Sequence, residues 1–209
     1  MATATAQFPN SRHLHQQYAE VLWDLSGGRD RALLTQSGQE ATRALEIAFR
    51  FGKVDYGLTD RLAETLGRTG NRETLDRLFQ EALKLDSSAV IYLNYARGLA
   101  LLGDPRAGDL FYKAAQLQPD GDAMVRYGEW LLDRGQNQQA LDRLPRSGPL
   151  RYVHFLRGIA LERLGRADEA KQEYAQFREY SATFPAPERF RIPGSRLQAG
   201  IHFKEAADS

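Results

Sequence analysis

Two histidines near the N-terminus are the first residues in this 209-residue chain whose types could support chemistry. His13 and His15 stand two residues apart, and imidazole nitrogens are common ligands of transition metals. A metal site would need further ligands, and none stands nearby in the sequence. We therefore expect no metal ion to bind there.

A third histidine and a pair of acids could take part in proton transfer. His154 lies among Tyr152, Phe155 and Leu156, so packing or lining a groove is favoured over action as a general base. Asp60 and Glu64 lie one helical turn apart, but the sequence shows no opposed partner for acid–base work. A solvated helix face is the favoured interpretation of this acid pair.

Known catalytic motifs are missing from the sequence. It contains no glycine-rich phosphate loop, zinc-protease helix or nucleophile elbow. The chain has no cysteine, which excludes disulfides and thiolate metal sites. We therefore expect no catalytic residue, no cofactor, no metal and no enzymatic activity.

The overall charge is balanced, at +1 from 28 basic and 27 acidic residues, and gives no general attraction to nucleic acid or anionic membranes. The first residues have no basic segment followed by an apolar run, so they predict no secretory signal. No apolar run approaches the roughly 18 residues of a membrane helix. We expect a cytoplasmic protein that neither inserts into membranes nor binds nucleic acid.

Apolar residues recur at helical spacing along most of the chain, and the clearest example runs from Ala89 to Pro119. Two helical segments there flank Gly103-Asp104-Pro105, which is typical of one helix ending and another beginning. Breaks of the same kind follow at intervals in the thirties, at Gly70, Gly103, Gly135 and Gly165. The pattern predicts a series of helical hairpins, with helices near 13–25, 39–51, 57–69, 72–85, 89–102, 105–117, 121–134, 137–144, 150–164 and 167–181.

Small and large residues recur at matching positions of these hairpins. In the first helices of four successive hairpins, a small residue recurs as Ala63, Ala96, Gly128 and Gly158. Three residues after each of these stands a large one, in order Leu66, Leu99, Leu131 and Leu161. In the second helices a small residue recurs as Ala107, Ala140 and Ala170, whereas the first of the four hairpins has Leu75 at this position. Four residues after each of these positions stands a large residue, in order Phe79, Phe111, Leu144 and Tyr174. Small residues let two helices approach, and large residues fill the space beside them.

In these positions the chain resembles the tetratricopeptide repeat family over residues 57–181. The resemblance implies an all-α, right-handed solenoid of antiparallel helix hairpins. We expect a disordered N-terminus at 1–12, a repeat domain at 13–181 with a degenerate first hairpin at 13–52, and an irregular tail at 182–209. The tail is expected to fold back on the last hairpin as a cap or into its groove, or to begin another domain.

In this family the first helix of each hairpin lines a concave groove. The resemblance therefore implies a groove that begins polar and becomes apolar towards the last hairpin, and its candidate partner-binding residues are Leu93, Arg97, Val125, Arg126, Glu129, Tyr152, Phe155 and Ile159. Packing of half of these residues within the fold is an equally supported interpretation. Some family members bind a terminal carboxylate through Lys, Asn and Arg, and Asn94 and Arg126 match two of those positions. Asp60, Glu64 and Asp122 stand at the others and would repel a carboxylate.

The function best supported by the sequence is a non-catalytic scaffold or adaptor that binds a peptide or partner helix in the groove. One alternative is a regulatory domain of a larger enzyme or assembly. A homo-oligomer formed through exposed hairpin faces is another, and a nucleic-acid-binding helical repeat is the third. The last would need its arginines clustered on one face, whereas acids are interleaved with them.

Overall fold

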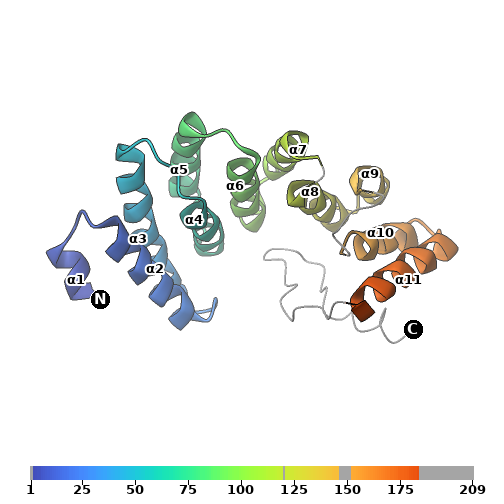
Figure 1. The fold of residues 1–209 in the computed structure, drawn as a ribbon, viewed down its shortest axis with the longest axis horizontal. Coiled ribbons are helices and arrows are strands. Elements are labelled where there is room, and N and C mark those ends of the chain that lie inside the picture. The colour runs from blue at the N-terminus through green and yellow to red at the C-terminus, as the bar shows by residue number, and fades with distance from the viewer. Residues whose placement is uncertain (1, 120, 146–151, 184–209) are drawn as a thin grey trace. The chain divides into compact units, whose positions relative to one another are not determined.

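In the computed structural model, which describes residues 2–119, 121–145 and 152–183, all regular secondary structure is helical (Figure 1). The chain forms two compact units, Met1–Ala114 and Ala115–Ser209. No helix in the described part of the chain is long and apolar enough to span a bilayer.

The first unit contains helices that pack against their neighbours in sequence and against helices two places along. α2 packs on α3, α4 on α5, and α4 on α6, with shorter contacts between α1 and α2 and between α3 and α5. The bounds are α1 (Ala2–Gln7), α2 (Arg12–Ser26), α3 (Arg31–Arg50), α4 (Tyr56–Thr69), α5 (Arg72–Leu85), α6 (Ala89–Leu101) and α7 (Ala107–Leu117), the last of which contains the boundary.

The second unit contains two further hairpins. α8 packs on α9 and α10 packs on α11, while α10 also contacts α8 and α9. The bounds are α8 (Asp122–Asp133), α9 (Asn137–Arg143), α10 (Tyr152–Arg163) and α11 (Ala167–Thr183). Helix α9 ends just before Pro145, as the sequence predicts, because the residue before a proline is disfavoured in the helical region and Leu144 is extended.

The predicted turns are confirmed by the backbone. Gly70, Gly103, Gly135 and Gly165 all have positive φ, between 69° and 82°. Only glycine adopts this left-handed conformation without strain, which is why it ends so many helices. The helices on either side begin and end within about two residues of the predicted bounds, apart from α3 and the segment 150–151, which lies outside the described residues.

Two predictions near the N-terminus are wrong. α1 occupies residues that the sequence predicts to be disordered, and α3 begins at Arg31 rather than at residue 39. Asp30 caps α3 by accepting hydrogen bonds from the backbone of Ala32 and Leu33. Gly38, which weakens a helix by itself, lies inside α3 because it packs against Thr65, so tertiary packing outweighs its propensity.

Small residues of the first helices face large residues of the second helices, as the repeat pattern predicts. A Cβ atom on Gly128 would overlap the Leu144 side chain, and one on Gly158 would overlap the Tyr174 ring. In both pairs the large residue lies sixteen positions after the glycine. The equivalent residues of the first unit, Ala63, Ala96, Phe79 and Phe111, are also buried.

The turn between α6 and α7 holds a polar network that the sequence pattern did not reveal. Asp104 is buried, and it accepts hydrogen bonds from the Arg106 backbone at 2.9 Å and side chain at 2.7 Å, and from Arg72. Arg106 also contacts Asp76 at 3.0 Å, and the Tyr95 hydroxyl donates to Asp76 at 2.6 Å. These donors lower the pKa of Asp104 to about 2, against the opposing effect of burial.

Candidate functional site

The two candidate groove residues of the first unit, Leu93 and Arg97, both lie on α6 and are half-buried. Arg97 forms an ion pair with Asp60 on α4, whose side chain is 53% exposed. One turn along α4, Arg68 pairs with Glu64 at 2.8 Å. The charges on this helix face therefore have intramolecular partners, whereas Leu93 and the partly exposed Val90 offer apolar surface beside them.

In the second unit the burial of the candidate residues supports the packing interpretation over an exposed apolar groove wall. Five of the six candidate residues there are buried, namely Val125, Glu129, Tyr152, Phe155 and Ile159. Only Arg126 is half-buried. The burial of Phe155 follows from aromatic packing within the last hairpin, where its ring centroid lies 5.4 Å from Phe177 and 6.2 Å from Tyr174 on α11.

A signal for this burial was present in the sequence of α10. Nine of its twelve residues are buried, and they point in all directions around the helix. A helix that is apolar on every side is typical of an internal position. The repeat alignment assigned one of those sides to a groove, although the residue pattern itself does not mark any side of α10 as solvent-facing.

Arg126 lies between two acids of its own helix, of which Glu129 is buried and Asp122 is exposed. Arg126 contacts Asp122 at 3.3 Å and Glu129 at 3.2 Å, both on its own helix. Burial dominates at Glu129 and raises its pKa to about 7, although Arg126 opposes the shift. Burial, and after it the nearby Glu129 carboxylate, raises the pKa of the Tyr152 hydroxyl far above its usual value. Glu129 is therefore a buried carboxyl group that can change its protonation state near neutral pH.

The two candidate carboxylate-binding residues have partners within the fold. Asn94 is buried and its Nδ2 atom donates to Thr59 Oγ1 at 3.2 Å. Arg126 is already bonded to two acids of α8. Both side chains are therefore engaged in contacts within their own units.

His154 is bonded to an acid inside the last hairpin. Its Nδ1 atom lies 2.7 Å from Glu173 Oε2 on α11, and the Arg157 Nε atom donates to Glu173 Oε1 at 2.6 Å. Arg157 also donates to the Leu141 and Leu144 carbonyl groups at 3.3 Å, which links α9 to the hairpin. This packing position agrees with the expectation for His154.

His15 has a similar environment in the first hairpin. Its Nδ1 atom lies 2.5 Å from Glu40 Oε2 on α3, and Arg43 donates to the other oxygen of Glu40 at 2.9 Å. His13, by contrast, is exposed. Within the described residues no group of three or more metal-type ligands comes together, at these histidines or elsewhere.

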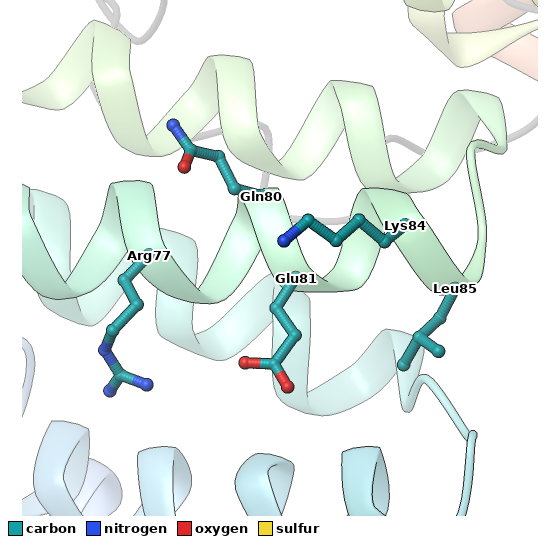
Figure 2. Close-up of a pocket in the computed structure, with 5 residues that line it drawn as sticks. All are labelled: Arg77, Gln80, Glu81, Lys84 and Leu85. Atoms are coloured by element: carbon teal, nitrogen blue, oxygen red, sulfur yellow. The ribbon is translucent and has the colours of Figure 1, made fainter.

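The sequence did not predict the hollows of the first unit. One, of about 510 Å³, is lined by Arg77, Gln80, Glu81, Lys84 and Leu85 of α5. Figure 2 shows Arg77, Glu81 and Leu85 projecting from one side of this helix and Gln80 from the other, with the Lys84 side chain along its surface. Arg77 reaches Glu46 of α3 at 2.7 Å, so the hollow is polar and partly bridged by an ion pair.

Comparison with protein-family models finds no match to the chain, and comparison with curated proteins likewise finds none. The resemblance to tetratricopeptide repeats therefore depends on the pattern of small, large and turn residues described above.

Proposed function

We propose that this protein is a non-catalytic scaffold of the tetratricopeptide type, a right-handed solenoid of helix hairpins that binds a peptide or a helix of a protein partner. The proposal is supported by the small–large pairs of the hairpins and by the left-handed glycines of their turns. Both features are typical of repeats that stack on one another, and stacked repeats commonly present extended binding surfaces.

The observation that carries the binding role is the exposed face of α6 in the first unit. Val90, Leu93 and Arg97 follow one another at spacings of three and four, so they lie on the same side of the helix. Val90 is 38% exposed, and the Arg97–Asp60 ion pair lies beside this apolar surface. Partly exposed apolar side chains with a charged border suit a partner helix or peptide.

The pairing of the arginines also favours a protein partner over nucleic acid. Phosphate contacts depend on basic side chains whose charge faces outwards. Here Arg97, Arg106 and Arg126 each contact one or two acids, and many other arginines do the same. This arrangement supports our proposal that the chain does not bind nucleic acid.

Affinity purification of the tagged full chain from its source cells, with identification of the bound proteins, tests the proposal. We expect a partner that binds the wild type and is lost with Leu93→Asp. The matched control is Leu85→Asp, which places the same charge at an exposed leucine of α5. Equal loss with both variants, or no loss with Leu93→Asp while the protein stays folded, would contradict a binding surface on α6.

A further inference from the structure

Helix α2 of the first unit carries a second line of side chains beside the face that packs on α3. The imidazole of His15 and the carbonyl oxygen of Ala19 mark the packed face, because they contact Glu40 and Ser37 of α3. The buried residues of this face are His15, Ala19, Leu22 and Ser26. The residues that precede them one by one are apolar or aromatic, and they form what we call the outer row: Leu14, Tyr18, Val21 and Leu25.

The outer row is only partly covered within the first unit. Leu25 is 68% exposed and Val21 is 38% exposed, whereas Leu14 and Tyr18 are half-buried. α1 borders the row at Tyr18, which lines the hollow between α1, α2 and α3. The row is therefore most open to solvent along the second half of α2.

The contact of α2 with α4 lies on the other flank of the helix. The guanidinium group of Arg61 on α4 lies 5.7 Å from the centre of the Trp23 ring, and Arg12 pairs with Asp55, the N-cap of α4, at 2.8 Å. Successive residues turn by about 100° around an α-helix, which places Trp23 and Arg12 opposite the outer row. The row therefore faces away from α4.

The spacing of the outer row is that of a seam between two helices. Its residues follow one another at intervals of four, three and four, and such alternation keeps side chains in line when two helices pack side by side. None of the four side chains is charged at neutral pH, so a helix on this row would bury no ion. Exposed apolar side chains in a row mark a place where another chain binds.

We propose that the outer row is the seam of a homodimer, in which α2 packs antiparallel against α2 of a second copy. A two-fold interface uses the same patch on both copies, so the patch must complement itself. The intervals of the row read the same in both directions. An axis between Tyr18 and Val21 therefore places Leu14 against the partner's Leu25 and Tyr18 against the partner's Val21.

The residues beside the row fit the same arrangement. Gln17 and Asp24 each precede a residue of the row, and the antiparallel pairing brings Gln17 close to the partner's Asp24. The amide of Gln17 can donate a hydrogen bond to that carboxylate, and the two Asp24 side chains lie at opposite ends of the seam. Tyr18 also meets the smaller Val21, whereas a parallel pair would place two tyrosines at one level.

The size of the row predicts a weak dimer. The row spans roughly 17 Å of helix and offers four side chains, two of which are already half-buried. A stable complex uses roughly 20–30 residues from each partner. We therefore expect a dimer that dissociates on dilution, and this dimer is independent of the partner surface that we propose on α6.

Sedimentation equilibrium of the purified full chain tests the dimer. The mean mass should rise from that of one chain at about 10 μM towards twice that mass at about 1 mM, since mass action populates a weak dimer. Val21→Lys combined with Leu25→Lys should abolish the rise, and the far-UV circular dichroism should not change because both residues are exposed. The matched control is Leu85→Lys on α5, at a leucine that is 44% exposed, and it should keep the rise. A monomer at every concentration, an unchanged rise in the double variant, or an equal loss in the control would overturn the proposal.

Disulfide cross-linking tests the antiparallel arrangement, because the chain has no cysteine of its own. The Cα atoms of a disulfide lie within about 7 Å of each other. A mixture of the Leu14→Cys and Leu25→Cys chains should cross-link several-fold faster than either variant alone, since the antiparallel seam separates identical positions by roughly 16 Å along the helix. Cross-linking of either variant alone as fast as the mixture would overturn the antiparallel seam.

Discussion

Two buried carboxyl groups, Asp104 in the first unit and Glu129 in the second, respond to their surroundings in opposite ways. Their exposed fractions are 2% and 3%. Asp104 receives one backbone and two guanidinium donors, and its pKa falls to about 2. Glu129 has one guanidinium at 3.2 Å, which Asp122 shares, and its pKa rises to about 7. At Asp104 the hydrogen bonds from Arg106 outweigh the loss of solvation, whereas at Glu129 the loss of solvation outweighs the contact with Arg126.

The same two units differ in how they fill an equivalent repeat position. The first unit places Ala96 there, and the second places Gly158 against the Tyr174 ring. The ring occupies the space that a Cβ on Gly158 would need, so this position of α10 has no room for the alanine that the first unit places at Ala96.

The largest expected effect comes from breaking this pair with Gly158→Leu. The added side chain must displace Tyr174 and separate α10 from α11, which should reduce the free energy of unfolding by about 3 kcal/mol. Ala96→Gly, the reverse exchange in the first unit, should cost only about 1 kcal/mol. Urea denaturation measures both, because Trp130 reports on the second unit and Trp23 on the first in single-tryptophan variants. An unchanged midpoint for Gly158→Leu would count against the repeat alignment.

The second prediction concerns Glu129→Gln. The folded-state pKa of Glu129 is raised from 4.5 to about 7, so the fold favours the protonated form, and the wild type loses stability as the pH rises through this range. The variant should therefore be more stable than the wild type by on the order of 2–3 kcal/mol above about pH 8, and similar to it near pH 4. Urea midpoints across this range measure the difference. Asp168→Asn, at a side chain that is 96% exposed, should show no such trend.

The third prediction, Asp104→Asn, should show the opposite dependence on pH. Because the pKa of Asp104 is lowered, its ionised form stabilises the fold at pH values above the ordinary pKa of 3.8, and this contribution is lost as the pH falls towards about 2. The variant should cost about 1–2 kcal/mol at neutral pH, because the amide replaces charge-assisted bonds to Arg72 and Arg106. Thermal unfolding at neutral and acidic pH measures the cost. An equal cost at both would show that the turn geometry matters and the charge does not.

The smallest effect should come from Asp60→Asn at the exposed ion pair with Arg97. Both partners reach solvent, so the pair contributes about 0.5 kcal/mol or less to the free energy of unfolding. A high salt concentration should remove this contribution. Urea denaturation at low and high ionic strength measures this. A cost as large as that of Asp104→Asn would mean that the α4–α6 face is tied together by its charges rather than by packing.

The sequence by itself determined the hairpins. Glycine at Gly103 or Gly165 ends a helix because of its own backbone freedom, and the apolar period of 3.6 residues marks which side chains share a face. Both properties are local, so the bounds of most helices could be predicted from neighbouring residues along the chain.

Only the tertiary structure decided which faces are covered. Phe155 and Ile159 have the spacing of a groove wall, but α11 and the neighbouring helices bury them, and helical periodicity does not say how many neighbours a helix has. The charge states of Asp104 and Glu129 depend in the same way on how strongly packing removes each carboxyl group from water and on which donors reach it. Burial and pKa are properties of what surrounds a side chain, and that environment exists only once the helices have packed.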